Sequence, residues 1–147
     1  MRRKLAIACA IWLAAGCSEP TQSTSHDPDP ALQDIYWAPV EIDGKALVIH
    51  AGTREAHIIL RSEGGRVTGF TGCNTLAGSF QQAGDTLRFG KLAMTRMACA
   101  GEGTNVLEGA LTKALEDTVS YRIIGGTLEL RNAAAVVRIR FTARPPQ

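Results

Sequence analysis

The sequence predicts a β-rich α+β domain, built as a curved antiparallel sheet or a small barrel with one α-helix. Three observations support this fold class. Short runs of alternating apolar residues recur along the chain and are separated by turns that contain glycine. One segment that begins at Val106 has apolar residues at helical spacing. The last part of the chain has the pattern of a tight β-hairpin.

Composition and charge favour a single soluble domain. The chain has 147 residues, of which 45% are hydrophobic and 20% are charged, as in ordinary globular proteins. The formal net charge of +2 includes Arg2, Arg3 and Lys4, which lie in a segment that we expect to be removed. Without them, 13 basic residues stand against 14 acidic residues, and the net charge is −1. Because a nucleic-acid binder shows a basic patch, we expect no nucleic acid partner.

The N-terminus predicts a signal peptide over residues 1–16. A basic start precedes the apolar run Leu5 to Ala15, which is too short for a membrane span of about 20 residues. The following Leu13-Ala14-Ala15-Gly16-Cys17 resembles a bacterial lipoprotein box, in which the cysteine receives lipid, such as palmitate, and becomes the first mature residue. The leucine lies one place earlier than in the commonest box. An ordinary signal peptide that leaves Cys17 as a free thiol is the alternative.

Residues 17–31 predict a lipidated, flexible tether. From Ser18 to Pro30 there is no large apolar side chain, so this stretch cannot offset the entropy of ordering and spans about 20 Å as a coil. We expect the lone His26 to be solvated rather than metal-bound. Ser18, and not Asp, follows Cys17, which favours the periplasmic face of the outer membrane. The N-terminal lipid makes the membrane the first expected partner.

The folded domain is expected over residues 32–144. Trp37 is expected to anchor the first strand in the core, because its ring buries a large area and its N–H needs one partner; ligand stacking is the alternative. In the strands that follow, Ile58 and Leu60 share one face, and Val67 and Phe70 are candidates for burial. These strands are expected at Ala46–His50, Ala56–Arg61, Arg66–Phe70, Ser79–Gln81 and Thr86–Phe89.

One helix and a closing hairpin complete the prediction. The helix ends near Thr118, and Asn105 and Glu108 have the spacing of an N-terminal capping box. Its apolar stripe comprises Val106, Leu107, Ala110, Leu111, Ala114, Leu115 and Val119. The hairpin strands are Tyr121–Ile124 and Thr127–Arg131 around Gly125-Gly126, followed by a strand in which Val137, Ile139 and Phe141 alternate with Arg138 and Arg140.

The segment from Thr71 to Ala100 contains Cys73 and Cys99, the two cysteines expected in the folded domain. In an oxidising compartment such a pair is usually bonded. Closing a loop of about 27 residues would stabilise the domain by about 3.5 kcal/mol. Free thiols are one alternative. A metal site with His50 and His57 is another, although neither pair has the short spacing of zinc ligands.

The sequence does not predict an enzyme or a cofactor. No G-x-S-x-G elbow and no phosphate-binding loop that ends in Gly-Lys-Ser/Thr occur. The sequence places no base near either cysteine. Asp85, Glu102 and Glu108 are explained as turn or cap residues rather than as a catalytic carboxylate pair.

Two polar residues of this segment remain as binding or structural candidates. Arg96 lies among Met94, Met97 and Ala98, where partial burial would require acceptors such as loop carbonyls or Glu102. The alternative role of Arg96 is contact with an anion or a partner. Asn74 follows Gly72-Cys73 and is expected to bond to its own backbone in a turn. We favour a structural role for both residues.

Two motifs resemble the META domain, or HslJ-like, family. They are Gly69-Phe70-Thr71-Gly72-Cys73-Asn74 with Gly78, and Thr95-Arg96-Met97-Ala98-Cys99. The resemblance extends from Trp37 to Phe141 and implies a compact, β-rich domain that is often exported or lipid-anchored. Members have been linked to heat shock, envelope stress and antibiotic tolerance. No catalytic residues come with the resemblance.

Two functional hypotheses follow. The first is a monomeric, non-enzymatic envelope lipoprotein that supports stress and antibiotic tolerance by binding an envelope protein or component. The second is a periplasmic domain that binds a small molecule or a metal at the mouth of the barrel. A thiol-redox role is disfavoured because no Cys-x-x-Cys occurs.

Overall fold

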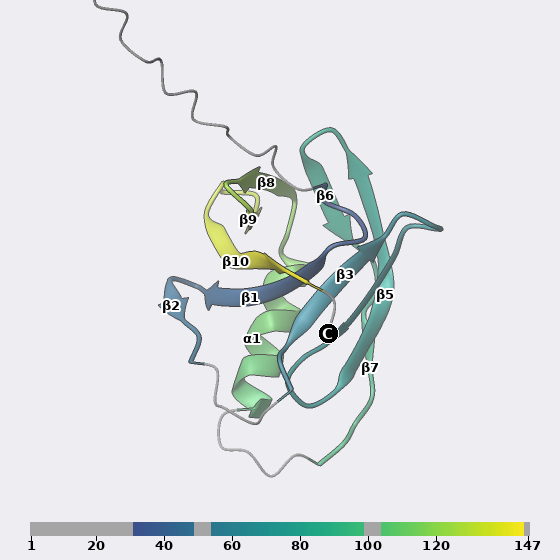
Figure 1. The fold of residues 1–147 in the computed structure, drawn as a ribbon, viewed down its shortest axis with the longest axis vertical. Coiled ribbons are helices and arrows are strands. Elements are labelled where there is room, and N and C mark those ends of the chain that lie inside the picture. The colour runs from purple at the N-terminus through teal and green to yellow at the C-terminus, as the bar shows by residue number, and fades with distance from the viewer. Residues whose placement is uncertain (1–30, 49–53, 99–103, 146–147) are drawn as a thin grey trace, which may run out of the picture.

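The computed structural model describes residues 31–48, 54–98 and 104–145 (Figure 1). Ten strands and one helix lie within these residues. The strands are β1 (Tyr36–Ile42), β2 (Lys45–Ala46), β3 (His57–Arg61), β4 (Arg66–Phe70), β5 (Thr75–Ala83), β6 (Thr86–Phe89), β7 (Ala93–Met94), β8 (Ser120–Ile124), β9 (Thr127–Arg131) and β10 (Val137–Arg144), and the helix α1 is Thr104–Glu116.

Eight of the strands form a closed antiparallel barrel in the order β1-β3-β4-β5-β6-β8-β9-β10. The pairing of β10 with β1, from Tyr36↔Arg144 to Ile42↔Ile139, closes the barrel. The two-residue strands β2 and β7 are outside this ring and pair with β1 and β5. The predicted β-rich fold with one helix is therefore confirmed, in its barrel form.

Inward-pointing and outward-pointing side chains alternate along the strands, and the inward-pointing ones form one common core. Side chains that point inward are almost completely removed from water, and each contributes about 1.5–3 kcal/mol of hydrophobic stabilisation. The fully buried strand residues include Ile58, Leu60, Val67, Leu87, Leu128, Leu130, Ile139 and Phe141. Trp37 is also fully buried, and its Nε1–H donates to the Leu32 carbonyl at 2.8 Å. The anchoring role predicted for Trp37 is confirmed.

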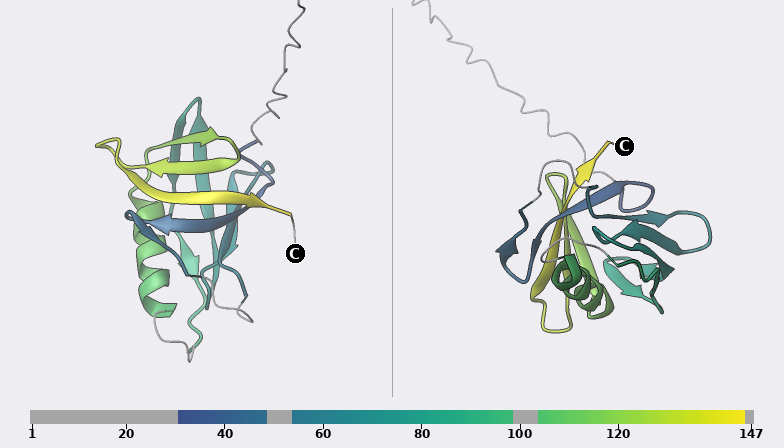
Figure 2. Two further views of the ribbon diagram at one scale, coloured as in Figure 1. Left: turned by 60° about the vertical axis from the view of Figure 1, so that its left-hand side comes forward. Right: turned by 90° about the horizontal axis from the view of Figure 1, so that it is seen from below.

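Helix α1 packs against β1, β6 and β10 and places Leu111, Ala114 and Leu115 in the barrel core. Seen from below in Figure 2, it lies between the yellow-green strands β8–β10 and the teal strands. At this position β6 and β8 share a single register pair, Thr86↔Ser120. In the described part of the chain, no helix combines the length and the apolar character needed to cross a membrane.

Glycine fixes the closing hairpin as expected. Gly125 and Gly126 have φ of +55° and +74° between β8 and β9. Positive φ at both central residues is the requirement of a two-residue turn that matches the strand twist. The observed bounds of β9 are those predicted.

The predictions for the strand at 46–50, for Phe70 and for Val106 were wrong, and the strand predicted at Ser79–Gln81 is the longer β5, Thr75–Ala83. The run 46–50 was expected to be a strand, but β2 includes only Lys45–Ala46, and residues 49 and 50 lie outside the described residues. Phe70 lies three positions after the buried Val67, so the two-residue period of β4 places it on the opposite, outer face. Val106 is 75% exposed and is not part of the buried helical stripe.

The outer surface of β8, β9, β10 and β1 has a row of alternating charges. The cross-strand partners Arg122, Glu129, Arg140 and Glu41 follow one another across the four strands. Arg140 bonds to Glu41 and, at 3.0 Å, to Glu129. Opposite charges on directly facing positions stabilise strand pairs, so this row supports the closure of the barrel. We call these four residues the charge row.

Candidate functional site

Asn74 lies in the loop between β4 and β5 and is buried. Its Oδ1 accepts hydrogen bonds from the Met97 backbone N–H at 2.7 Å and from the Thr95 hydroxyl at 3.0 Å. Its Nδ2 donates to Glu108 Oε2 at 2.9 Å. A single buried amide therefore connects the start of β5, the segment after β7 and helix α1.

Thr71 and Glu108 complete this network. Thr71 is fully buried, and its hydroxyl donates to Glu108 Oε2 at 2.6 Å and accepts from the Asn74 backbone N–H at 3.0 Å. The predicted capping box is wrong, because the helix begins at Thr104, Asn105 lies inside it, and Glu108 turns toward this loop. The missed signal was that Glu108 precedes Leu111 and Leu115 at helical spacing, on the face that packs against the barrel.

Cys73 is buried beside this network, with 4% of its surface exposed. Its Sγ lies 3.5 Å from the carbonyl oxygen of Met97. Met97 precedes Cys99 by two positions in the sequence. Cys99 lies outside the described residues. The predicted pairing of Cys73 with Cys99 therefore stays a prediction.

Arg96 is exposed, and so are its neighbours Thr95 and Met97. The expected partial burial of Arg96 is wrong, because β7 pairs only with β5 and the segment that follows runs along the surface. Glu102, its expected partner, lies outside the described residues. Asn74 and Arg96 were grouped as one candidate site, but the first is a buried connector and the second faces solvent.

His57 lies in an aromatic stack on the outer face of β3. Its ring lies 4.1 Å from that of Tyr36 and 6.5 Å from that of Phe70, measured between centroids. The guanidinium carbon of Arg54 lies over the Phe70 ring, 4.3 Å from its centroid. Burial lowers the pKa of His57, although a hydrogen bond with the Glu55 carbonyl opposes this. His50, the other histidine of the alternative metal site, lies outside the described residues, and within them no cluster of three metal-ligating side chains occurs.

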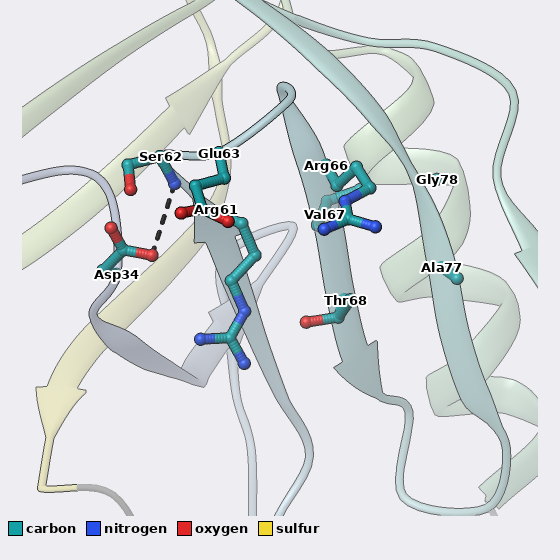
Figure 3. A pocket seen from close by; sticks show the side chains of 9 residues that line it. All are labelled: Asp34, Arg61, Ser62, Glu63, Arg66, Val67, Thr68, Ala77 and Gly78. Atoms are coloured by element: carbon teal, nitrogen blue, oxygen red, sulfur yellow. Dashed lines mark hydrogen bonds between the residues drawn. The ribbon is translucent and has the colours of Figure 1, made fainter.

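An open groove of about 640 Å³ lies on the outer face of β3, β4 and β5 (Figure 3). One side is formed by Asp34 and the end of β3, and the other by β4 and β5 (Figure 3). Its lining residues are Asp34, Arg61, Ser62, Glu63, Arg66, Val67, Thr68, Ala77 and Gly78. Sequence reasoning missed this groove, because it depends on the approach of residue 34 to the β3–β4 turn.

The walls of the groove carry charges of both signs. Arg61 and Arg66 are direct cross-strand partners and both are exposed. Among the described residues, neither forms an ion pair with a carboxylate. The carboxylate of Asp34 accepts from the Ser62 backbone N–H at 3.3 Å. Hydrogen bonds with Ser62 lower the pKa of Asp34, and the nearby Arg61 contributes to the same shift, so Asp34 is ionised at neutral pH.

The rim residue Asp34 has a left-handed backbone, with φ of +59°. This conformation is uncommon for a residue other than glycine. Two hydrogen bonds hold it in place: its N–H donates to the Leu60 carbonyl at 2.8 Å, and its side chain bonds to Ser62. The rim is therefore fixed to the end of β3.

Comparison with solved structures supports the fold. An NMR structure of a protein from Burkholderia xenovorans is 24% identical, with a TM-score of 0.58, and the match covers 95% of this chain and 100% of that one. A second NMR structure is 22% identical, with a TM-score of 0.59, over 76% of this chain and 90% of the other. At these identities the likeness concerns the fold alone. No curated protein matches the chain.

The family model of the META domain matches residues 30–145. This range includes the whole barrel, the helix and both motifs of the Thr71–Ala100 segment. The chain belongs to the META domain family.

Proposed function

We propose that this chain is a bacterial envelope lipoprotein whose META barrel acts by binding and not by catalysis. In this proposal, binding supports tolerance of envelope or heat stress and of antibiotics. The groove on β3–β5 is the observation that carries the proposal, because its charged walls face solvent and are accessible to a ligand.

The family motifs favour a structural role over chemistry. Thr71, Asn74 and Glu108 are polar groups at the motif loops, and they are engaged in hydrogen bonds that join the β4–β5 loop, the segment after β7 and α1. A general acid or base must reach the proton that it transfers. These groups are instead engaged in connecting elements of the fold, which supports binding elsewhere on the barrel.

The tether and the groove meet at the same end of the domain. The predicted tether ends at residue 31, and Asp34, three residues later, forms one wall of the groove. Lipid on Cys17 and a coil of about 20 Å would hold this end close to a membrane surface. The proposed lipidation would therefore keep the groove close to the membrane surface.

Fractionation of cells that express Cys17→Ala tests the anchor. We expect the wild-type chain in the outer-membrane fraction, with a mass increased by the attached acyl chains. The variant should appear in the soluble periplasmic fraction. Ser18→Asp is a matched variant that keeps the lipid, and it should move the protein toward the inner membrane. An unchanged membrane fraction for Cys17→Ala would contradict the lipoprotein assignment.

Binding of a small ligand is the second candidate, and the same groove favours it. A ligand that binds only the folded state raises the unfolding midpoint. A thermal-shift screen that finds such a ligand would support this candidate. Crosslinking in intact cells that recovers one envelope protein, together with a flat screen, would instead support a protein partner.

A further inference from the structure

The strand pair β3–β4 places two arginines at directly opposite positions, where their like charges repel each other. Arg61 and Arg66 face each other directly in the register of the antiparallel pair, and like charges at such positions destabilise a sheet. In the described part of the chain no carboxylate forms an ion pair with either one. By contrast, Arg131, Arg138 and Arg140 on β9 and β10 all pair with carboxylates.

The space beside this pair is open because the neighbouring strand presents small residues. Ala77 and Gly78 on β5 are the register partners of Thr68 and Val67 on β4. A Cβ atom at Gly78 would lie 2.9 Å from the Lys91 carbonyl oxygen, so packing explains that glycine. Ala77 is exposed and has no such explanation. Its small side chain leaves the floor of the groove free.

Among the described residues Asp34 forms no ion pair with either arginine, although Arg61 is near enough to help lower the pKa of Asp34. Its carboxylate is turned to the Ser62 backbone N–H, and Figure 3 shows the Arg61 guanidinium directed away from it. The Thr68 hydroxyl lies on the side of β4 that faces Arg61 (Figure 3). Two guanidinium groups and one hydroxyl are therefore available on the same outer face of the sheet.

This donor set fits a tetrahedral oxyanion. A guanidinium presents a planar fork that binds phosphate through two parallel hydrogen bonds. The phosphodiester of a phospholipid headgroup carries its charge on two non-bridging oxygens, which together can accept hydrogen bonds from two guanidinium groups and a hydroxyl. Asp34 and Glu63 on the rim limit the site to a compact anion, because a long polyanion would lie against both carboxylates.

We propose that Arg61, Arg66 and Thr68 bind a ligand's phosphate group, supplied by the headgroup of an anionic phospholipid. The inference that the ligand carries a phosphate group depends only on the residues of the groove. The choice of a lipid rests on the proposed lipid anchor, because the tether joins the domain beside the groove. In this arrangement the barrel lies with the β3–β4 turn toward the membrane.

Vesicle binding tests the proposal with the purified mature chain, residues 17–147, that carries Cys17→Ala so that no acyl chain contributes. We expect binding to phosphatidylcholine vesicles only when they contain phosphatidylglycerol, because the choline cation cancels the charge of the phosphate in phosphatidylcholine and would be repelled by the arginines. Arg61→Ala and Arg66→Ala should each weaken it about tenfold, the loss typical of one charge-assisted hydrogen-bonding partner. Arg122→Ala is the matched control, because it removes one exposed positive charge from the charge row and should leave binding almost unchanged.

A second variant pair tests the groove without changing any charge. Ala77→Phe should fill the floor and abolish binding, and Ala83→Phe, at another exposed position of β5, should not affect it. Circular dichroism and thermal unfolding of each variant separate lost binding from lost folding.

Titration with inorganic phosphate distinguishes the source of the ligand. Vesicle binding with the expected variant pattern supports the lipid headgroup. Saturable phosphate binding with the same pattern but no vesicle binding supports the phosphate site and overturns its lipid source. No binding in either arm, or an equal loss in Arg122→Ala, overturns the proposal. Because the anchor is absent here, the outcome is independent of the fractionation experiment on Cys17.

Discussion

Two polar regions of the barrel contrast in how their hydrogen-bonding groups are used. In the Thr71–Glu108 network, a buried threonine, a buried asparagine and a half-buried glutamate bond to one another and connect three elements. In the groove on β3–β5, Arg61 and Arg66 face solvent from directly opposed positions. The polar groups of the Thr71–Glu108 network therefore stabilise the fold. The arginines of the groove are instead accessible to a ligand.

The contrast predicts opposite results of substitution. Changes in the network should reduce stability by several kcal/mol, and changes in the groove should leave stability nearly unchanged or raise it. Four experiments cover the cysteine beside the network, the network itself, the charge row as an intermediate case and the groove, from the largest expected effect to the smallest.

The predicted Cys73–Cys99 disulfide should give the largest effect. Reduction should lower the free energy of unfolding by about 3.5 kcal/mol, because the unfolded chain regains the entropy of the opened loop. Urea unfolding with and without reductant measures this difference, in a Cys17→Ala background. Two titratable thiols in the aerobically purified protein, and no effect of reductant, would contradict the pairing.

Asn74→Ala should lower the free energy of unfolding by about 3 kcal/mol. The substitution removes Oδ1, which accepts from both the Met97 N–H and the Thr95 hydroxyl, and Nδ2, which donates to Glu108, and it leaves these part-buried groups without that partner. Thr75→Ala, at the exposed next position, is the control and should change stability by less than about 0.5 kcal/mol. Equal effects of the two substitutions would show that the network does not hold the fold together.

The charge row should give a smaller and pH-dependent effect. Hydrogen bonding by Arg131 lowers the pKa of Glu129, burial opposes the shift, and Arg140 adds to it. Since the folded-state pKa lies below the unfolded value, this stabilisation is present above pH 4.5, the ordinary pKa of glutamate, and is lost as the pH falls through the folded pKa.

Glu129→Gln should therefore lower stability by about 1.5 kcal/mol at neutral pH, and the difference from wild type should shrink in acid. Unfolding curves across this pH range measure the difference, with the exposed Glu116→Gln as control. A difference that is constant with pH would show that the ionised form of Glu129 has no special stabilising role.

The groove should give the smallest effect, in the opposite direction. Arg66→Thr relieves the repulsion with Arg61 and introduces a residue that is favourable in strands, so stability should rise by about 0.5 kcal/mol. Arg122→Thr removes an arginine that faces Glu129, so its stability should fall by a similar amount. A loss of stability in Arg66→Thr would mean that Arg66 has a structural role and would weaken the contrast between the two regions.

Local sequence patterns were sufficient for most of the fold. The observed bounds of β4, β6 and β9 agree with the predicted ones, because each strand is a short run closed by a glycine-containing turn. The buried positions Ile58 and Leu60 of β3 and Ile139 and Phe141 of β10 also agree, since alternation alone decides which side chains point inward.

Features that depend on contacts between distant segments could not be predicted. Glu108 has the spacing of a cap residue, and only the docking of α1 beside Thr71 and Asn74 shows its other role. The exposure of Arg96 depends on how β7 joins β5. The groove requires the closed barrel to bring Asp34 to Ser62, 28 positions away.

An NMR titration of the Cys17→Ala mature chain with inorganic phosphate tests the central claim most directly, because it reports every backbone amide at once. The account predicts saturable chemical-shift changes at the amides of Ser62, Arg66 and Thr68, with the amides of Asn74 and Glu108 unmoved. Changes centred on residues 71–75 and 94–98 instead would contradict it, because they would place the contact surface on the motif loops and not on the groove.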